Sequence, residues 1–169
     1  MNQMKKLVVF ATVLVFSVYG TAQTKNNKSA VGTWQLDLTH SDLGAEAAPK
    51  QVVLTILKDN SETLSWRTQS VDQNGNVFTY SWSGPTDGTT HPIETQDSTP
   101  IGTESVKRNA DGSLSRHGEI KDASFDARST VSEDGNTITD EITQKSSDGR
   151  ENKSKRVYRR VPAINGRRY

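Results

Sequence analysis

Asn74–Gly84 reads NGNVFTYSWSG, and this stretch decides the fold class of the chain. The Asn-Gly pair at its start is a preferred sequence for a two-residue hairpin turn. The run that follows alternates aromatic with small residues, and successive side chains of a β-strand point to opposite faces. Phe78, Tyr80 and Trp82 therefore share one face. The opposite face carries Val77, Thr79, Ser81 and Ser83. The pattern predicts a half-buried antiparallel strand that follows a tight turn.

The same two signals recur along the rest of the chain. The other hairpin-type dipeptides are Asp87-Gly88, Asp111-Gly112, Asp134-Gly135 and Asp148-Gly149. Short runs with strand-like composition lie between the turns. The predicted strands are Val31–Leu38, Gln51–Lys58, Glu62–Ser70, Val77–Gly84, His91–Thr95, Thr103–Arg108, Ser113–Ile120, Ala123–Ser132, Asn136–Ser146 and Arg150–Val161.

These strands predict an all-β fold built as a single antiparallel up-and-down meander. Its exposed edges must be hidden, either in a sandwich or by closure into a barrel. Sequential hairpins favour a closed barrel of about ten strands, with eight as the alternative, in which the first and last strands pair. The only helix candidate is Ser41–Ala48, which is at most about two turns long and is weakened by Gly44.

The first residues have the layout of a secretory signal peptide. Lys5 and Lys6 precede the apolar run Leu7–Tyr19, and the small residues Gly20-Thr21-Ala22 follow. The alternative, a transmembrane anchor, needs about 20 apolar residues, and this run is shorter. We therefore expect an exported protein, periplasmic or secreted, with no membrane span in its mature form. The expected organisation is a signal peptide at 1–22, a flexible leader at 23–30, a barrel domain at 31–161 and a C-terminal tail at 162–169.

The composition excludes several classes of function. The chain has no cysteine, which removes disulfides, thiol catalysis and cysteine metal sites. Its 21 basic and 20 acidic residues nearly balance, so no bulk charge indicates a nucleic-acid partner. His40, His91 and His117 have no ligand spacing, so no metal site is predicted. No phosphate-binding loop, dinucleotide motif or nucleophile elbow is present, and we predict no cofactor and no enzymatic activity.

Both ends of the predicted barrel carry a family resemblance. Gly32-Thr33-Trp34 resembles the start of lipocalins and of fatty-acid-binding proteins, the two main calycin branches. Arg156 and Tyr158 resemble the R-x-Y triplet in the closing strand of the fatty-acid-binding branch. A set of uncharacterised exported bacterial proteins with a lipocalin-like barrel is also similar, over roughly Val31 to Val161. The motifs that carry this second resemblance are Gly32–Leu36, Pro49-Lys50, Asp87–Pro92 and Val157-Tyr158.

The chain departs from both calycin branches in ways that limit the resemblance. Fatty-acid-binding proteins are cytosolic and insert a helix-turn-helix lid after the first strand, whereas Thr39–Lys50 is too short for two helices. Lipocalins have eight strands and usually disulfides. The resemblance therefore implies a barrel with a pocket, and it carries over no ligand.

The resemblance directs attention to the two terminal strands of the predicted barrel. We expect Trp34 to plug one end of the core beneath an arginine of the closing strand, although it would otherwise line a ligand site. Arg156 and Tyr158 share a face and are candidates to hold an anionic headgroup such as that of a fatty acid. The alternatives are a solvent-facing Arg156 and a purely structural pair between Arg156 and Asp140.

The aromatic residues Trp66, Phe78, Tyr80 and Trp82 are candidates for the wall of the same pocket, the alternative being ordinary core. The leading functional hypothesis is an exported barrel that binds or carries a small amphipathic or hydrophobic ligand, an anionic lipid being one candidate. The alternative is an exported structural or protein-interaction domain whose barrel is filled by side chains. The sequence leaves the oligomeric state open.

Overall fold

A computed structural model describes residues 29–162. All the secondary-structure elements in this range are β-strands, and there is no helix among them. The predicted signal peptide, most of the leader and nearly all of the tail lie outside the described residues. The strands are β1 (Gly32–Leu36), β2 (Gln51–Asp59), β3 (Thr63–Val71), β4 (Val77–Pro85), β5 (Asp87–Thr95), β6 (Pro100–Arg108), β7 (Leu114–Ile120), β8 (Ala123–Val131), β9 (Thr137–Ser146) and β10 (Glu151–Arg160).

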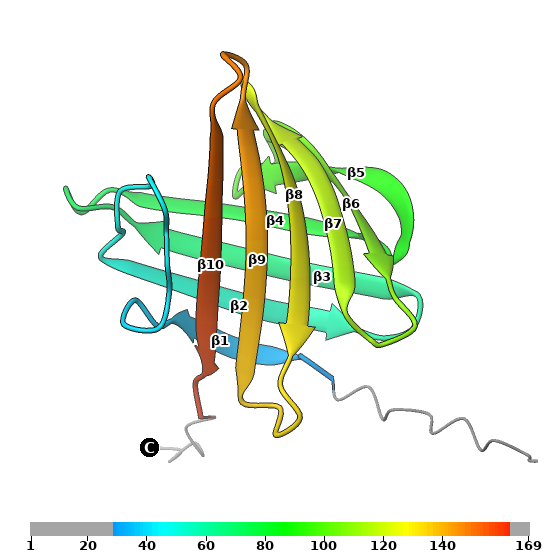
Figure 1. The fold of residues 1–169 in the computed structure, drawn as a ribbon. Coiled ribbons are helices and arrows are strands. Elements are labelled where there is room, and N and C mark those ends of the chain that lie inside the picture. The colour runs from blue at the N-terminus through cyan, green and yellow to red at the C-terminus, as the bar shows by residue number, and fades with distance from the viewer. Residues whose placement is uncertain (1–28, 163–169) are drawn as a thin grey trace, which may run out of the picture.

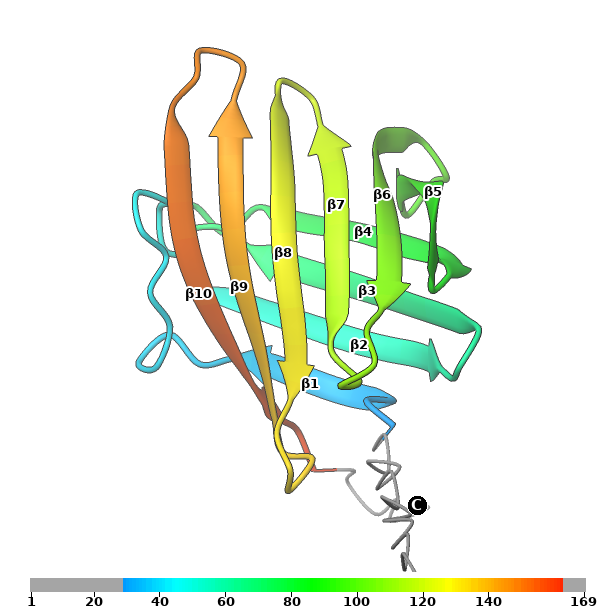
Figure 2. The same cartoon turned by 45° about the vertical axis from the view of Figure 1, so that its right-hand side comes forward.

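The strands form a closed antiparallel barrel in which each strand pairs with its neighbours in the chain. Closure is made by β1 against β10, with Trp34 opposite Arg160 and Leu36 opposite Tyr158. The strands β1 and β10, blue and brown-red in Figure 1, accordingly lie side by side at one end of the barrel. The predicted ten-strand meander and its closure are confirmed. Figures 1 and 2 also show β7–β10 running steeply across β2–β4 on the opposite wall, as the strand tilt of a closed barrel requires.

The connection between β4 and β5 differs from the prediction. Asp87-Gly88 is not a hairpin turn, because it forms the start of β5, four residues before the predicted start at His91. The register of β5 against β6 shifts between Asp87 and Thr90, which marks a β-bulge. A bulge accommodates extra residues and bends the strand without ending the pairing, so the strand continues through a sequence that is typical of a turn.

Residues 37–50, which connect β1 to β2, form turns and no helix, so the Ser41–Ala48 helix candidate is wrong. Asp42 instead makes an isolated antiparallel bridge with Lys155 of β10. The Ser41 hydroxyl accepts a hydrogen bond from the Val157 N–H at 2.9 Å rather than capping a helix. This connection, called the β1–β2 loop below, therefore lies along the edge of β10, beyond the residues of β10 that pair with β1.

The barrel is closed at one end by Trp34, as the G-x-W position predicts. Trp34 has no exposed surface, and the Arg160 guanidinium stacks 4.0 Å from its ring centroid. The indole N–H donates to the Ala30 carbonyl at 2.9 Å. Ala30, assigned to the leader by the sequence, is itself buried and belongs to the barrel core.

Across residues 29–162 there is no helix with the length and apolar character needed to cross a bilayer.

Candidate ligand cavity

A cavity of about 710 Å³ lies inside the barrel. Its walls are the inward faces of the strands, where alternate residues point to the interior. About half of the residues that line the cavity are apolar, including Leu54, Ile56, Leu64, Trp66, Ile93, Leu114, Ile120, Phe125, Ile138 and Ile142. Side chains therefore do not fill this interior.

A charged cluster of three side chains from different strands lines this cavity. Glu104 of β6 is fully buried, and its Oε1 accepts a hydrogen bond from Arg116 Nε of β7 at 2.5 Å. Arg116 NH1 also approaches Asp140 Oδ2 of β9, at 3.4 Å. Burial alone would lower the pKa of the Arg116 guanidinium, but the two carboxylates outweigh it and raise that pKa. Arg116 therefore stays charged between the two acids.

The same arginine lies against an aromatic wall. Its guanidinium carbon is 5.6 Å from the Trp66 ring centroid, a cation–π distance. Trp66 in turn meets Tyr80 edge to face, with centroids 5.8 Å apart. Both rings line the cavity. The charged cluster and the aromatic wall are thus parts of one site.

Several buried polar atoms of this site have no hydrogen-bond partner among the described residues. They are the acceptors Glu104 Oε2 and Asp140 Oδ1 and the N–H donors Trp66 Nε1, Arg108 Nε and Arg156 Nε. Buried polar groups are nearly always paired, and an unpaired one costs about 1–3 kcal/mol. A site with unpaired acceptors and unpaired donors is suited to a ligand that has polar groups of its own.

Arg156 and Tyr158 both line the cavity, as the resemblance implies. Arg156 NH2 pairs with Glu46 Oε2 of the β1–β2 loop at 2.5 Å. Burial lowers the pKa of Arg156, while Tyr158 and Glu46 raise it, and the net shift is upward. Asp140 lies opposite Arg156 in the β9–β10 register but contacts Arg116 instead. The Arg156–Asp140 pair considered from the sequence is therefore replaced by Arg156–Glu46.

The two cavity tyrosines are held in their neutral form. Burial is the main cause that raises the pKa of the Tyr158 and Tyr80 hydroxyls. Asp140 raises the pKa of Tyr158 further, while Arg156 opposes the shift. Two neutral phenols beside the charged cluster give the site additional hydrogen-bonding groups.

Of the predicted aromatic wall, Trp66 and Tyr80 line the cavity, whereas Trp82 and Phe78 do not. Trp82 is buried in the core, and its indole N–H donates to the Glu104 carbonyl at 3.0 Å. Phe78 is 56% exposed. Tyr80 is the first residue of β4 that pairs with β5, and Phe78 comes before it. Phe78 instead lines a second, more open pocket together with Val77 and Tyr80.

The sequence reasoning missed Glu46, Glu104 and Arg116. Glu104 and Arg116 carried a detectable signal, since each lies two residues from an apolar residue on the inward face of its strand, Val106 and Leu114. A charged residue at such a position must be paired inside a barrel. Glu46 carried no such signal, because it lies in the loop.

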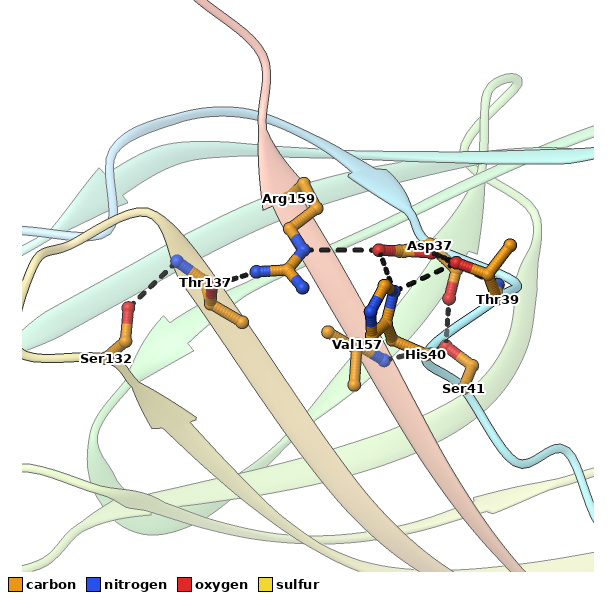
Figure 3. Close-up of polar contacts among 8 residues, drawn as sticks. All are labelled: Asp37, Thr39, His40, Ser41, Ser132, Thr137, Val157 and Arg159. Atoms are coloured by element: carbon orange, nitrogen blue, oxygen red, sulfur yellow. Dashed lines mark hydrogen bonds and ion pairs between the residues drawn. The ribbon is translucent and has the colours of Figure 1, made fainter.

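A second polar cluster attaches the β1–β2 loop to β10 (Figure 3). Asp37 Oδ2 lies 2.7 Å from His40 Nδ1 and accepts a hydrogen bond from Arg159 Nε at 3.2 Å. Hydrogen bonds lower the pKa of the Asp37 carboxyl, the largest contribution being that of Thr39. The Ser41 hydroxyl donates to the Asp37 carbonyl and accepts from the Val157 N–H. Both hydrogen-bonding roles of this serine are taken, so the Asp–His–Ser grouping clamps the loop.

Among the described residues, no group of three or more histidine, cysteine, aspartate and glutamate side chains is arranged to hold a metal ion.

The fold has counterparts among solved structures. An asparagine-to-alanine mutant of the fluorescent protein UnaG matches with a TM-score of 0.51 and 14% sequence identity, over 78% of this chain and 96% of that one. The fold is calycin-like. The M. tuberculosis protein Rv2717c matches with a TM-score of 0.42 and 11% identity, over 79% of this chain and 93% of that one. No family model matches the sequence of this calycin-like barrel, and no curated protein matches it.

Proposed function

We propose that the protein is an exported binding or carrier protein, and not an enzyme, which takes a small amphipathic ligand into its barrel. The observation that carries the proposal is the cavity of about 710 Å³ in the barrel interior. Small-molecule sites are typically about 300–1,000 Å³ in volume, mostly apolar, with a few polar groups that orient the ligand. The cavity has this size, and it combines a large apolar surface with several polar and charged groups that could orient a ligand.

The main alternative, a filled barrel with a structural or interaction role, loses support from the side chains of β8. Ala127 and Ser129 line the cavity, and both are small. A filled barrel would place large side chains at such positions to reach the packing density of protein interiors. The space beside β8 is instead left for a ligand.

The export part of the proposal rests on Leu7–Tyr19 and its flanking residues, which have the composition of a signal peptide. An anionic headgroup at Arg156 and Tyr158 would have to compete with Glu46, which holds the Arg156 guanidinium. The polar end of the ligand is therefore treated separately below.

The test is the saturable binding of a neutral, environment-sensitive dye such as Nile red by the mature protein. Ala127→Phe puts a ring into the cavity from β8 and should abolish dye binding. Asp126→Phe adds the same ring at the adjacent outward position, where the side chain is 71% exposed, and should leave binding unchanged. Thermal unfolding of both variants verifies that they fold. Equal loss of binding in both variants, or no saturable binding by the wild type, would refute the proposal.

A further inference from the structure

The Glu104–Arg116–Asp140 cluster that lines the cavity carries an excess of negative charge. Two of the arginines that line it, Arg108 and Arg156, each have one carboxylate partner, Asp59 and Glu46. The third, Arg116, is shared by two carboxylates, Glu104 and Asp140. No lysine is among the described residues that line this cavity. The Glu104–Arg116–Asp140 cluster therefore holds two acids and one cation.

The second acid of this cluster is only weakly engaged. Asp140 Oδ2 lies 3.4 Å from Arg116 NH1, which is beyond the usual range of an N–H···O hydrogen bond. Its other oxygen, Oδ1, and Oε2 of Glu104 are buried without a partner among residues 29–162. A buried carboxylate that lacks its counter-charge is strongly unfavourable. A positively charged ligand group with N–H donors would supply that counter-charge.

Aromatic rings in the same cavity also favour a cation. Trp66, Tyr80, Phe125 and Tyr158 all line it. The faces of aromatic rings carry negative charge density and attract ammonium and guanidinium groups. Arg116 over Trp66, at 5.6 Å, already shows this interaction with a cation of the protein itself. Rings and unpaired carboxylate oxygens are independent features, and both select positive charge.

We propose that the ligand is an amphipathic cation, an amine or amidine whose charged end binds at Asp140 and Glu104 and whose apolar body lies against the aliphatic wall. This inference rests on the proposed binding function and names its ligand class. A carboxylate ligand would find an unpaired donor at Arg156 Nε, but Glu46 already balances the charge of that guanidinium, and the two acids Glu104 and Asp140 line the same cavity.

The experiment is competition against Nile red by amphiphiles of one chain length that differ only in the polar end: decylammonium, decyltrimethylammonium, decanol and decanoate. Decylammonium should bind tightest, because it has both charge and N–H donors. Asp140→Asn should weaken decylammonium binding by about 10- to 100-fold, the range for loss of a charge-assisted hydrogen bond. Decanol binding should change by less than about 3-fold, within the effect of a neutral contact.

Two further variants complete the test. Glu104→Gln should weaken decylammonium binding in the same direction as Asp140→Asn, and retained dye and decanol binding shows that either variant is folded. Asp126→Asn removes a carboxylate from the outside of β8, where it contacts His117, and should change nothing.

The outcomes separate this inference from the proposed function. No saturable dye binding by the wild type would overturn both. Dye and decanol binding without any advantage for decylammonium, or a decylammonium affinity unchanged by Asp140→Asn, would overturn only the cationic class. Tightest binding of decanoate, lost in Arg156→Ala, would overturn it in favour of an anionic lipid.

Discussion

Trp34 and Arg160 illustrate at the residue scale how a short motif can define a buried structure. The Trp34 ring is fully enclosed, its N–H is bonded to Ala30, and the Arg160 guanidinium covers it at 4.0 Å. The ring thus satisfies its polar atom and fills the end of the barrel. It stabilises both the core and the closure between β1 and β10.

Trp34→Ala should destabilise the domain by about 3–5 kcal/mol, the range for removing a large buried aromatic side chain. Urea unfolding followed by circular dichroism measures the change. Phe78→Ala is the matched control, because Phe78 is 56% exposed, and it should change stability by less than about 0.5 kcal/mol. Equal effects of the two substitutions would contradict the burial of Trp34.

The buried Tyr158 predicts a dependence of stability on alkaline pH. Burial raises the pKa of its hydroxyl above the ordinary value of 10.0. Because the folded protein keeps the proton longer than the unfolded chain, its stabilisation is complete below pH 10 and is lost as the pH rises toward the folded pKa. The free energy of unfolding of the wild type should therefore fall above about pH 10. Tyr158→Phe should show a shallower fall in urea titrations across this range, and an unchanged slope would contradict this account.

At the element scale, the β1–β2 loop shows why a segment with a helix-like composition does not form a helix. Its polar groups bond to β10: Ser41 with Val157, Ala45 N–H with Asn152 Oδ1 at 2.8 Å, and Glu46 with Arg156. These contacts replace the backbone bonds of a helix and hold Glu46 beside the cavity. The loop thereby supplies the carboxylate that pairs with the Arg156 guanidinium at the cavity.

Gly44 tests the fit of this loop against β10. Its φ of +59° favours glycine, and an added Cβ would collide with the Lys153 carbonyl and the Asn152 side chain. Gly75 has a similarly positive φ of +89° but has open space around it. Gly44→Ala should therefore destabilise the protein more than Gly75→Ala, which carries only the backbone strain of about 1 kcal/mol. Gly44→Ala should also speed hydrogen exchange at the Ala45 and Val157 amides. Equal stability losses and unchanged exchange would contradict the close packing of the loop.

At the scale of the whole molecule, the closed barrel gives every strand a partner on both sides and surrounds the cavity. Closure brings together side chains from strands that are not neighbours, such as Glu104 of β6 and Asp140 of β9 on either side of Arg116. The chain needs no disulfide for this arrangement, since it has no cysteine. Its stability therefore depends on the core and on the complete circle of strand pairing.

The proposed export predicts where the mature chain begins. The layout of the first residues places cleavage after Ala22, so the mature protein should begin at Gln23 or within about two residues of it. Intact mass spectrometry of the exported protein measures this directly. A soluble product whose mass still includes Leu7–Tyr19 would show that the apolar run is retained.

The sequence by itself determined the strands, the order of their pairing and the Trp34 plug, because these depend on local alternation, on turn residues and on one terminal motif. It also placed Arg156 and Tyr158 on one face, which follows from their spacing alone. Only the tertiary structure decided that Arg156 pairs with Glu46, that Arg116 joins Glu104 and Asp140, and that Phe78 lies outside the cavity. These contacts depend on loop path, strand tilt and register across the barrel. The cavity volume is likewise the space that remains after all side chains have packed. It depends on every strand at once and therefore cannot be predicted from any single segment of the sequence.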